Sequence, residues 1–543
     1  MATTTLLPDF IMASVCIGFI WFSGYSSCHQ QSSDKKPNFI IILADDMGWG
    51  DLGANMAAGQ SHTPNLDKLA LEGLRLTDFH SAASTCSPSR ASLLTGRLGI
   101  RNGVTHNFAA TSVGGLPINE TTLAEALKPS GYMTGLIGKW HLGHHGSFHP
   151  NSRGFDYYYG IPYSNDMGCT DSPGYDLPAC EPCPQRASSP HRPDGGCSTK
   201  LALPLMENAA ILEQPLKLSS LSSRYSHQAV TFIMNARRMG RPFFLYVALA
   251  HMHVPLSPAH VRPGRGPYEE SLREMDQLVG NIRACSDGNT LIWFTGDNGP
   301  WAQKCHLSGS VGPFLGKWQT MQGGSSAKQT TWEGGHRVPA LVYWPGHIPP
   351  NRTSSALLST LDIFPTLVTL AQGTLPANRQ FDGKDVSEIL VGAPQDPQRV
   401  SGSTCPADLQ DPYPGQIMYH PNSGAAGRIG DIEAIRLGHY KAFYTTGGAL
   451  ACDGSIGRSR LHDPPLLFDL NRDPQEMTPV PHGSEEYEQL LPLISRAMAA
   501  LQDDVRTDNV STADYFQDPS VAPCCNPALA ACRCKEPAGD CYH

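Results

Sequence analysis

The sequence predicts an α/β protein with a doubly wound, mixed sheet and a smaller C-terminal domain that contains an antiparallel sheet. Apolar runs rich in β-branched and aromatic residues are typical of strands buried on both faces of a sheet, and they occur at 37–44, 242–249 and 290–295. Segments with helical spacing alternate with these runs, which favours parallel strands joined by helices. Past about residue 395 the pattern changes to short strands joined by turns. We therefore expect a first domain over 36–395 and a second over 396–543.

The expected elements follow one another in order along the chain. Helices are predicted at 63–74, 122–128, 222–239 and 357–371, and further strands at 133–137 and 338–344. In the smaller domain we expect a hairpin of 432–437 and 440–445, a strand at 466–470 and an amphipathic helix over 485–501. The remaining tail is rich in cysteine.

Composition excludes several classes of protein. The chain has 543 residues, of which 40% are hydrophobic and 16% charged, as expected for a folded protein with a large core. Its formal net charge of −9 argues against nucleic acid as the main partner. An anionic substrate would therefore need a local cluster of cations.

The N-terminus and the cysteines indicate the secretory pathway. Residues 1–27 are predicted to be a signal peptide with an apolar core at 10–22, although they lack the usual positive charge. No later stretch is apolar enough to span a bilayer, so we expect no stable membrane insertion; a membrane anchor is the alternative. The sixteen cysteines favour disulfides, with zinc binding through Cys180 and Cys183 as the alternative. Predicted glycosylation acceptors are Asn119, Asn351 and Asn509.

Cys86 opens a distinctive stretch, CSPSRASLLTGR, over residues 86–97. Pro88 suits the first helical position and Gly96 a left-handed helix end, so the stretch is predicted to be a loop that runs into a helix. Cys86 would then lie beside free N–H groups that favour an anion. The alternative is a structural or disulfide cysteine ahead of an ordinary surface helix.

Acidic residues follow two of the predicted buried strands. Asp45 and Asp46 come after 37–44, and Asp297 and Asn298 come after 290–295. Ligands of open α/β sheets bind beyond the carboxyl ends of the strands, so these side chains are expected to meet there. Three carboxylates and an amide oxygen suit Ca²⁺ or Mg²⁺ rather than zinc or copper.

Cations are expected around the same point. Arg90, Lys139, Lys328 and two histidines, His141 and His253, could surround a tetrahedral anion and stabilise charge that develops on it. For each of them the alternative is an ordinary solvated charge or a packed core histidine. Three further histidines, His144, His145 and His149, match no standard metal motif and are expected in a solvated loop.

Five stretches together resemble the formylglycine-dependent sulfatase family, of the alkaline-phosphatase-like fold. They are residues 42–51 (ILADDMGWGD), 86–97, 138–143 (GKWHLG), 295–299 (TGDNG) and 331–335 (TWEGG), within a span of similarity from 37 to 473. The resemblance implies that formylglycine-generating enzyme oxidises Cys86, and that one Ca²⁺ ion is bound by Asp45, Asp46, Cys86, Asp297 and Asn298. It also implies that formylglycine and sulfate are held by Arg90, Lys139, His141, Ser164, His253 and Lys328. Asn165 stands where several members of the family have histidine.

The same resemblance implies a reaction and a substrate. One hydroxyl of hydrated formylglycine, activated by Ca²⁺ and Asp297, would attack sulfur, with His253 as the acid; the second hydroxyl would then expel sulfate. Histidine acid catalysis suits an acidic compartment. The implied location is the lysosome, and the implied substrates are 3-O-sulfated glucosamine of heparan sulfate and small aryl sulfates.

Two other functions stay open on sequence alone. One is a metal-dependent phosphatase or phosphodiesterase of the same fold, which predicts a second metal site, commonly through Asp-His after the equivalent strand. This chain has Asp297 and Asn298 there, which counts against that alternative. The other is a non-catalytic secreted glycan-binding protein in which Cys86 remains a thiol or forms a disulfide.

Overall fold

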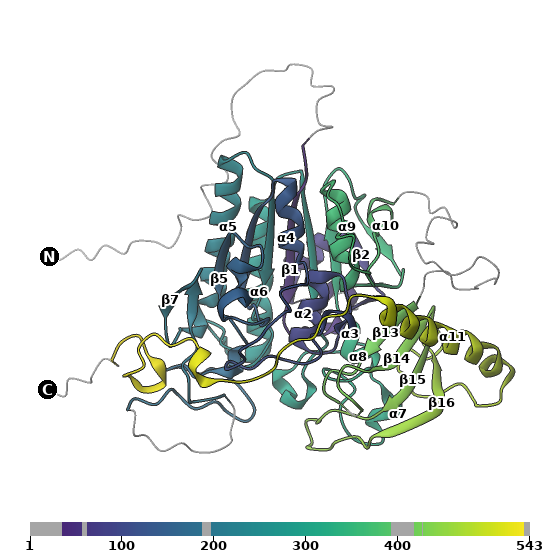
Figure 1. Ribbon diagram of the computed structural model, residues 1–543. Coiled ribbons are helices and arrows are strands. Elements are labelled where there is room, and N and C mark those ends of the chain that lie inside the picture. The colour runs from purple at the N-terminus through teal and green to yellow at the C-terminus, as the bar shows by residue number, and fades with distance from the viewer. Residues whose placement is uncertain (1–34, 57–61, 187–196, 393–416, 426, 537–543) are drawn as a thin grey trace, which may run out of the picture.

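The computed structural model describes residues 35–56, 62–186, 197–392, 417–425 and 427–536. It contains one large mixed sheet covered by helices and a smaller antiparallel sheet with a long helix beside it (Figure 1). The predicted signal peptide and the predicted domain boundary near residue 395 lie outside the described residues.

The large sheet has ten strands. In spatial order they are β11 (Arg352–Ser354), β2 (Leu74–Leu76), β10 (Ala340–Tyr343), β9 (Thr290–Gly296), β1 (Asn38–Ala44), β8 (Phe243–Ala248), β4 (Met133–Gly138), β5 (Tyr157–Gly160), β6 (Leu205–Glu207) and β7 (Ala210–Glu213). Its centre, from β9 to β5, is parallel, whereas β10, β6 and β7 run antiparallel to a neighbour. The predicted doubly wound mixed sheet is confirmed.

Strand β1 shows why both faces need helices. Phe39, Ile41 and Leu43 point into one apolar cluster, while Ile40 and Ile42 point into another. The first cluster contains α2 (Cys86–Thr95), α4 (Leu123–Leu127) and α9 (Ile363–Leu370); the second contains α1 (Pro64–Glu72), α5 (Leu221–Arg238) and α6 (Pro267–Cys285). Each fully buried side chain of this size stabilises the fold by about 2 kcal/mol, so the centre of the sheet forms a rigid base.

The smaller sheet is built from β13 (Ile417–Pro421), β14 (Ile432–Leu437), β15 (Tyr440–Thr446) and β16 (Arg460–Asp469), all antiparallel. Helix α11 (Glu485–Thr507) buries Tyr487, Leu490 and Ile494 against it. The remaining short elements are β3 (Phe79–His80), α3 (Gly99–Asn102), α7 (Lys317–Thr320), α8 (Glu333–His336), β12 (Leu358–Ser359) and α10 (Ser387–Val391).

Several elements differ from the sequence expectations. Helix α6 was not predicted. The predicted helix at 357–371 begins only at Ile363, because β12 and one 3-10 turn precede it. Strand β16 starts at Arg460, earlier than expected. Pro464 and Pro465 interrupt the alternating pattern that identifies a strand in the sequence. The structure tolerates these prolines because β16 is an edge strand.

Five disulfides lie among the described residues. They are Cys169–Cys183, Cys180–Cys197, Cys305–Cys452, Cys524–Cys532 and Cys525–Cys534. Cys180 and Cys183 are bonded to different partners, so disulfides are confirmed and the zinc alternative is wrong. Such bonds indicate an oxidising, secretory compartment. Within the described part of the chain, no helix combines the length and apolar character needed to cross a membrane.

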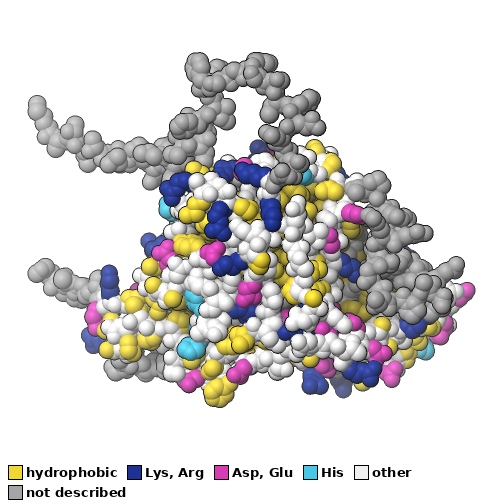
Figure 2. All heavy atoms as spheres, turned by 45° about the horizontal axis from the view of Figure 1, so that its top comes forward, with side chains coloured by type: hydrophobic (Ala, Val, Ile, Leu, Met, Phe, Trp, Pro, Cys, Tyr) yellow, Lys and Arg dark blue, Asp and Glu magenta, His cyan; other side chains and the backbone are white. Residues whose placement is uncertain are grey.

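Figure 2 looks onto the end of the molecule at which β1 enters the sheet. Basic, acidic and apolar side chains are intermixed on this face. The site described below lies at the opposite end of the strands, and its cations are buried rather than displayed on a surface.

Candidate active site

The predicted acidic residues meet at the carboxyl ends of two neighbouring strands. Ala44 of β1 is paired in register with Gly296 of β9, so the residues that follow each strand leave the sheet side by side. Asn298 Nδ2 donates to Asp46 Oδ1 at 2.7 Å, and the Asp46 amide donates to Asp297 Oδ1 at 3.2 Å. The structure thus brings Asp45, Asp46, Asp297 and Asn298 together, all buried.

Cys86 lies beside this cluster at the first position of helix α2. Thr85 precedes the helix and Gly96 ends it in the left-handed conformation, with φ of 68°. Pro88 occupies the third helical position, not the first as predicted, because the helix begins at the cysteine itself. Cys86 Sγ lies 3.5 Å from Asp45 Oδ1 and 3.6 Å from Lys328 Nζ, and it is not in a disulfide.

The surroundings of Cys86 disfavour a thiolate. Burial raises the pKa of the thiol, and the nearby Asp45 carboxylate raises it further, well above the ordinary value. The thiolate is the nucleophilic form of cysteine, so an unmodified Cys86 would stay protonated and inert.

Each predicted cation is buried against its own carboxylate. Lys139 Nζ lies 2.6 Å from Asp45 Oδ2, and Lys328 Nζ lies 2.6 Å from Asp46 Oδ1. Arg90 donates through Nη2 and Nε to Asp297 Oδ2, at 2.7 and 3.0 Å. The alternative that these are solvated charges is wrong, since all three side chains are buried.

These pairs set the charge state of Asp45. Burial raises its pKa, but the nearby Lys139, His253, Arg90 and Lys328 outweigh burial and hold the pKa well below its usual value. Asp45 is therefore ionised at any physiological pH.

Each of the two predicted histidines has one ring nitrogen held by a backbone carbonyl, which defines its other nitrogen. His141 Nε2 lies 2.9 Å from the carbonyl oxygen of Phe108, which can only accept, so Nε2 carries the hydrogen. Burial, followed by Lys139 and Arg90, holds the pKa of His141 well below its usual value, so the ring is neutral and Nδ1 is an acceptor. His253 Nδ1 similarly donates to the Val254 carbonyl at 2.6 Å, which leaves His253 Nε2 facing the site, 3.7 Å from Asp46 Oδ2.

Ser164 lies between Lys139 and His253. Its hydroxyl lies 3.1 Å from Lys139 Nζ and 3.5 Å from His253 Nε2. The neighbouring Asn165 donates to the carbonyls of Ala250 and His253 at 3.3 and 3.4 Å, and so supports the backbone that carries His253.

The acidic cluster has the chemistry of a divalent-cation site. Asp46 Oδ2 and Asn298 Oδ1 are buried and have no hydrogen-bond partner among the described residues. Ligand atoms of Asp45, Asp46, Cys86 and His253 lie within 4.8 Å of one another. Buried polar atoms rarely stay unpartnered, and oxygen ligands suit a hard cation, so the residues present fit such an ion.

The other predicted positions lie apart from this cluster. Asn119, Asn351 and Asn509 are exposed, as glycosylation acceptors must be. His145 is exposed, but His144 and His149 are buried, so the expected solvated loop is wrong for those two. Both instead pack edge-on against tyrosine rings, His144 on Tyr163 and His149 on Tyr158.

Sequence reasoning missed residues that support the site indirectly. Trp301 packs against His253, with ring centroids 5.4 Å apart, and its ring lies 4.7 Å from Lys328 Nζ. Ser87 donates its hydroxyl to the His141 carbonyl at 2.7 Å. No motif identifies these contacts, because they arise between segments far apart in the sequence.

The site gathers buried cations and carboxylates at one point, as the binding of an anionic ester requires, and comparison with known proteins gives the family. The Sulfatase family model matches residues 37–374, and a second model, the C-terminal region of aryl-sulfatase, matches residues 414–534. The chain belongs to the sulfatase family and is a sulfuric ester hydrolase.

Individual relatives agree with this assignment. The chain is 62% identical to arylsulfatase G of Mus musculus over 507 residues, which cover 92% of this chain and 93% of the relative. It is 38% identical to arylsulfatase A of Homo sapiens, over 93% of this chain and 96% of the relative. A crystal structure of a sulfatase from Pseudoalteromonas sp. superimposes with a TM-score of 0.68 at 27% identity, over 88% of this chain and 92% of that one.

Proposed function

We propose that this chain removes sulfate from 3-O-sulfated glucosamine of heparan sulfate and from small aryl sulfates. The nucleophile is a formylglycine that formylglycine-generating enzyme makes from Cys86, and one Ca²⁺ ion accompanies it. The observation that carries the proposal is the position of Cys86 Sγ, within 3.6 Å of both a buried carboxylate and a buried ammonium group.

Asp45, Asp46, Asp297 and Asn298, with the modified Cys86, would hold the ion. Bound Ca²⁺ would polarise oxygen atoms of the ester and of the nucleophile. The hydrated formylglycine would supply one hydroxyl to attack sulfur and a second whose deprotonation lets sulfate leave, which a simple serine or thiol cannot do.

The chain's own residues handle the protons. His141 presents Nδ1 as an acceptor, because the Phe108 carbonyl holds the hydrogen on Nε2. His141 is therefore suited to accept the proton of a hydroxyl group at position 86. His253 keeps its Nδ1 hydrogen on the Val254 carbonyl, so the proton for the departing alcohol would leave from Nε2.

Lys139 and Lys328 would bind the sulfate oxygens, and Arg90 would orient Asp297. Both ammonium groups are already fixed against Asp45 and Asp46, so they need no reorganisation when negative charge develops on the ester. Ser164, within reach of Lys139 Nζ, would add one further hydrogen bond.

Similarity supports the glycan substrate, and similarity together with the chemistry of a histidine acid supports the lysosome. The relatives named arylsulfatase G are over 60% identical in mouse and human. A histidine acid works best where imidazolium is populated, as in an acidic compartment reached through the secretory pathway. We also propose a signal peptide at 1–27, a catalytic domain at 36–395, a second domain at 396–543, and glycans on Asn119, Asn351 and Asn509.

The test is a sulfate-release assay on the full chain secreted from cells that contain formylglycine-generating enzyme. We expect release of sulfate from an aryl sulfate and from a 3-O-sulfated glucosamine oligosaccharide, and loss of both activities in Cys86→Ala with folding retained. Chelation should lower the rate, and Ca²⁺ should restore it. Activity in Cys86→Ala would contradict the nucleophile, and turnover of the aryl sulfate alone would contradict the glycan substrate.

A further inference from the structure

The end of the chain returns from the smaller domain to the catalytic domain. We call residues 508–534 the C-terminal strap; it follows α11 and crosses the large domain (Figure 1). Its backbone lies directly on two glycines: a Cβ at Gly103 would be 2.7 Å from the Ser511 carbonyl oxygen, and one at Gly114 would be 2.2 Å from that of Asp514. Only glycine permits an approach this close.

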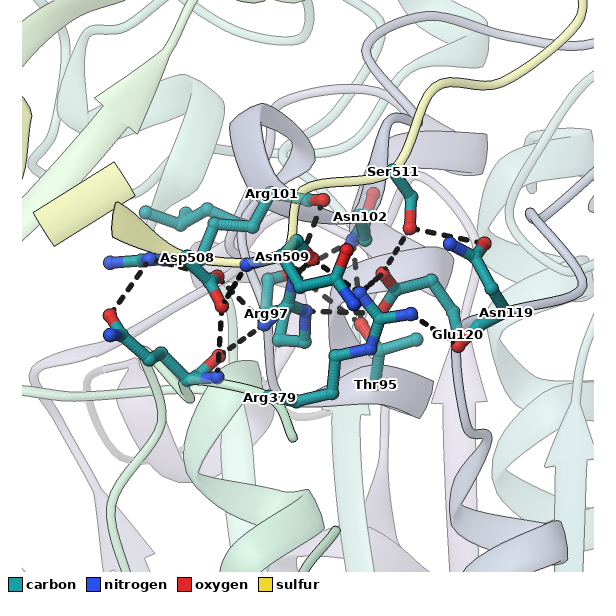
Figure 3. Close-up of polar contacts among 12 residues, drawn as sticks. Thr95, Arg97, Arg101, Asn102, Asn119, Glu120, Arg379, Asp508, Asn509 and Ser511 are labelled. Atoms are coloured by element: carbon teal, nitrogen blue, oxygen red, sulfur yellow. Dashed lines mark hydrogen bonds and ion pairs between the residues drawn. The ribbon is translucent and has the colours of Figure 1, made fainter. Parts of the chain in front are cut away.

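The first anchor of the strap is a buried ion network (Figure 3). Asp508 Oδ2 lies 2.9 Å from Arg97 Nη1 and 3.0 Å from Arg101 Nη1. Ser511 donates its hydroxyl to Glu120 Oε1 at 2.6 Å and its amide to the Arg101 carbonyl at 2.7 Å. Arg97 is the last residue of the stretch that begins at Cys86, so the strap is fastened just past helix α2.

The second anchor is Tyr515. Its hydroxyl oxygen accepts hydrogen bonds from the Thr105 and His106 amides, at 2.9 and 3.2 Å. The ring stacks on His106 and Phe108, with centroids 3.5 and 4.8 Å apart. One side chain of the strap therefore contacts three of the four residues in the loop 105–108.

The same loop holds two parts of the active site. The Phe108 carbonyl bonds His141 Nε2 at 2.9 Å, which fixes the ring's hydrogen and its direction. Asn107 Oδ1 accepts the Ser87 amide at 2.9 Å, and Ser87 is the neighbour of Cys86 in α2. The loop thus joins Tyr515, on one side, to His141 and the nucleophile segment, on the other.

We propose that Tyr515 is a positioning residue for sulfate-ester hydrolysis: by fixing the loop 105–108, it holds His141 and Ser87 in place beside Cys86. This inference rests on the proposed function of the site. Tyr515 lies more than 400 positions from Cys86 in the sequence, so the residues that support the active site include part of the C-terminal strap.

The test compares Tyr515→Ala, Tyr515→Phe and the control Phe516→Ala in the full-length secreted chain. Phe516 is the next residue of the strap, and its side chain is 67% exposed. We expect Tyr515→Ala to lower kcat for an aryl sulfate about 10- to 100-fold with KM nearly unchanged, because small misplacements of catalytic groups are costly. Tyr515→Phe, which keeps the stacking, should lose less, and Phe516→Ala should match the wild type.

Two further readouts separate positioning from general damage. Formylglycine content at position 86 and the folded fraction should be the same in all variants; a loss of kcat that follows either quantity would overturn the inference. Hydrogen exchange at the Thr105 and His106 amides should be faster in Tyr515→Ala and in Tyr515→Phe, because both lack the hydroxyl that accepts from these amides, and it should be unchanged in Phe516→Ala. If wild-type protein that contains formylglycine releases no sulfate, the proposed function is wrong. Hydrogen exchange tests the positioning role separately: unchanged exchange at these amides in Tyr515→Ala would overturn that role.

Discussion

Lys139 shows how single residues give the site its positive charge. Its ammonium group lies between Asp45 Oδ2 and Ser164 Oγ, at 2.6 and 3.1 Å. Burial lowers the pKa of Lys139, but Asp45 more than compensates, so the pKa is raised and the group stays charged. A buried, fixed cation of this kind acts on a developing anion far more strongly than a solvated one.

We predict that Lys139→Ala lowers kcat/KM for an aryl sulfate by about 10²- to 10³-fold, the range seen when one preorganised charge or donor is removed. Lys139→Arg should recover little of the loss, because a planar fork cannot replace a compact ammonium group. The exposed Lys217 provides the control, and Lys217→Ala should retain wild-type kinetics. Equal kinetics for Lys139→Ala and Lys217→Ala would contradict the role of Lys139 in binding sulfate.

At this scale the sequence was informative wherever a residue belongs to a motif at a strand end. Asp45, Asp297 and Lys139 could be placed because parallel strands bring their carboxyl ends to one edge of the sheet. The contact of Phe108 with His141 could not, since it involves a backbone carbonyl, which is the same in every residue. Only the folded chain shows which carbonyl is used.

At the scale of elements, helix α8 joins the catalytic sheet to the smaller one through a buried carboxylate. Glu333 accepts from Lys441 Nζ at 2.9 Å and from Arg436 Nη1 at 3.3 Å, and both donors belong to the smaller sheet. Arg337 and His80 contact Glu333 from the catalytic side, at 2.7 and 3.0 Å. A second carboxylate, Glu476, lies 3.8 Å from Lys441 Nζ.

Glu476 makes the stability of this junction depend on pH. Burial raises its pKa from 4.5 to about 7; Lys441 opposes the shift, and Glu333 adds to it. A carboxyl group whose pKa is raised by folding stabilises the fold fully below its unfolded pKa, and the stabilisation is lost as pH rises through the folded pKa. We therefore predict that Glu476→Gln leaves stability nearly unchanged at pH 4.5 but raises it by about 3 kcal/mol above pH 7.

Chemical denaturation at both pH values measures this difference. Glu488, which is exposed on α11, provides the matched control, and Glu488→Gln should shift stability little at either pH. If Glu476→Gln gave the same change at both pH values, its carboxyl group would not titrate between them, and the account of the junction would be wrong.

Elements whose hydrophobic residues recur with one clear period were predictable from the sequence. Elements whose sequence combines features of strands with features of turns were not. The hairpin of β14 and β15 matches its expected place closely, because a glycine turn joins two alternating strands. The two prolines of β16 argue against predicting a strand there unless it is known to lie at the edge of the sheet. That position is a property of the sheet and not of the local sequence.

At the scale of the whole molecule, the disulfide Cys305–Cys452 links the two regions; among the described residues it is the one that does so. Cys305 follows β9 in the catalytic region, and Cys452 follows β15 in the smaller one; 147 positions separate them. Cross-links that close longer loops restrict the unfolded chain more, so this bond should stabilise more than a short-range one. The C-terminal strap makes a second connection between the same two regions.

We predict that replacing Cys305 and Cys452 by serine lowers the free energy of unfolding by about 5 kcal/mol, against about 2.5 kcal/mol for the pair Cys524 and Cys532. The second pair spans only 8 positions and is the control. Thermal or denaturant unfolding of the two double variants gives the comparison. An equal or smaller loss for the long-range pair would show that the disulfide does not act by restricting the unfolded chain.

The proposed mechanism requires that the group at position 86 is an aldehyde when the enzyme is active. Mass spectrometry of the peptide that spans residues 82–90, taken from an active preparation, tests it most directly. We expect that sulfur is lost from this peptide, that oxygen takes its place, and that specific activity rises in proportion to the converted fraction. An intact cysteine in a fully active preparation would show that formylglycine is not the nucleophile.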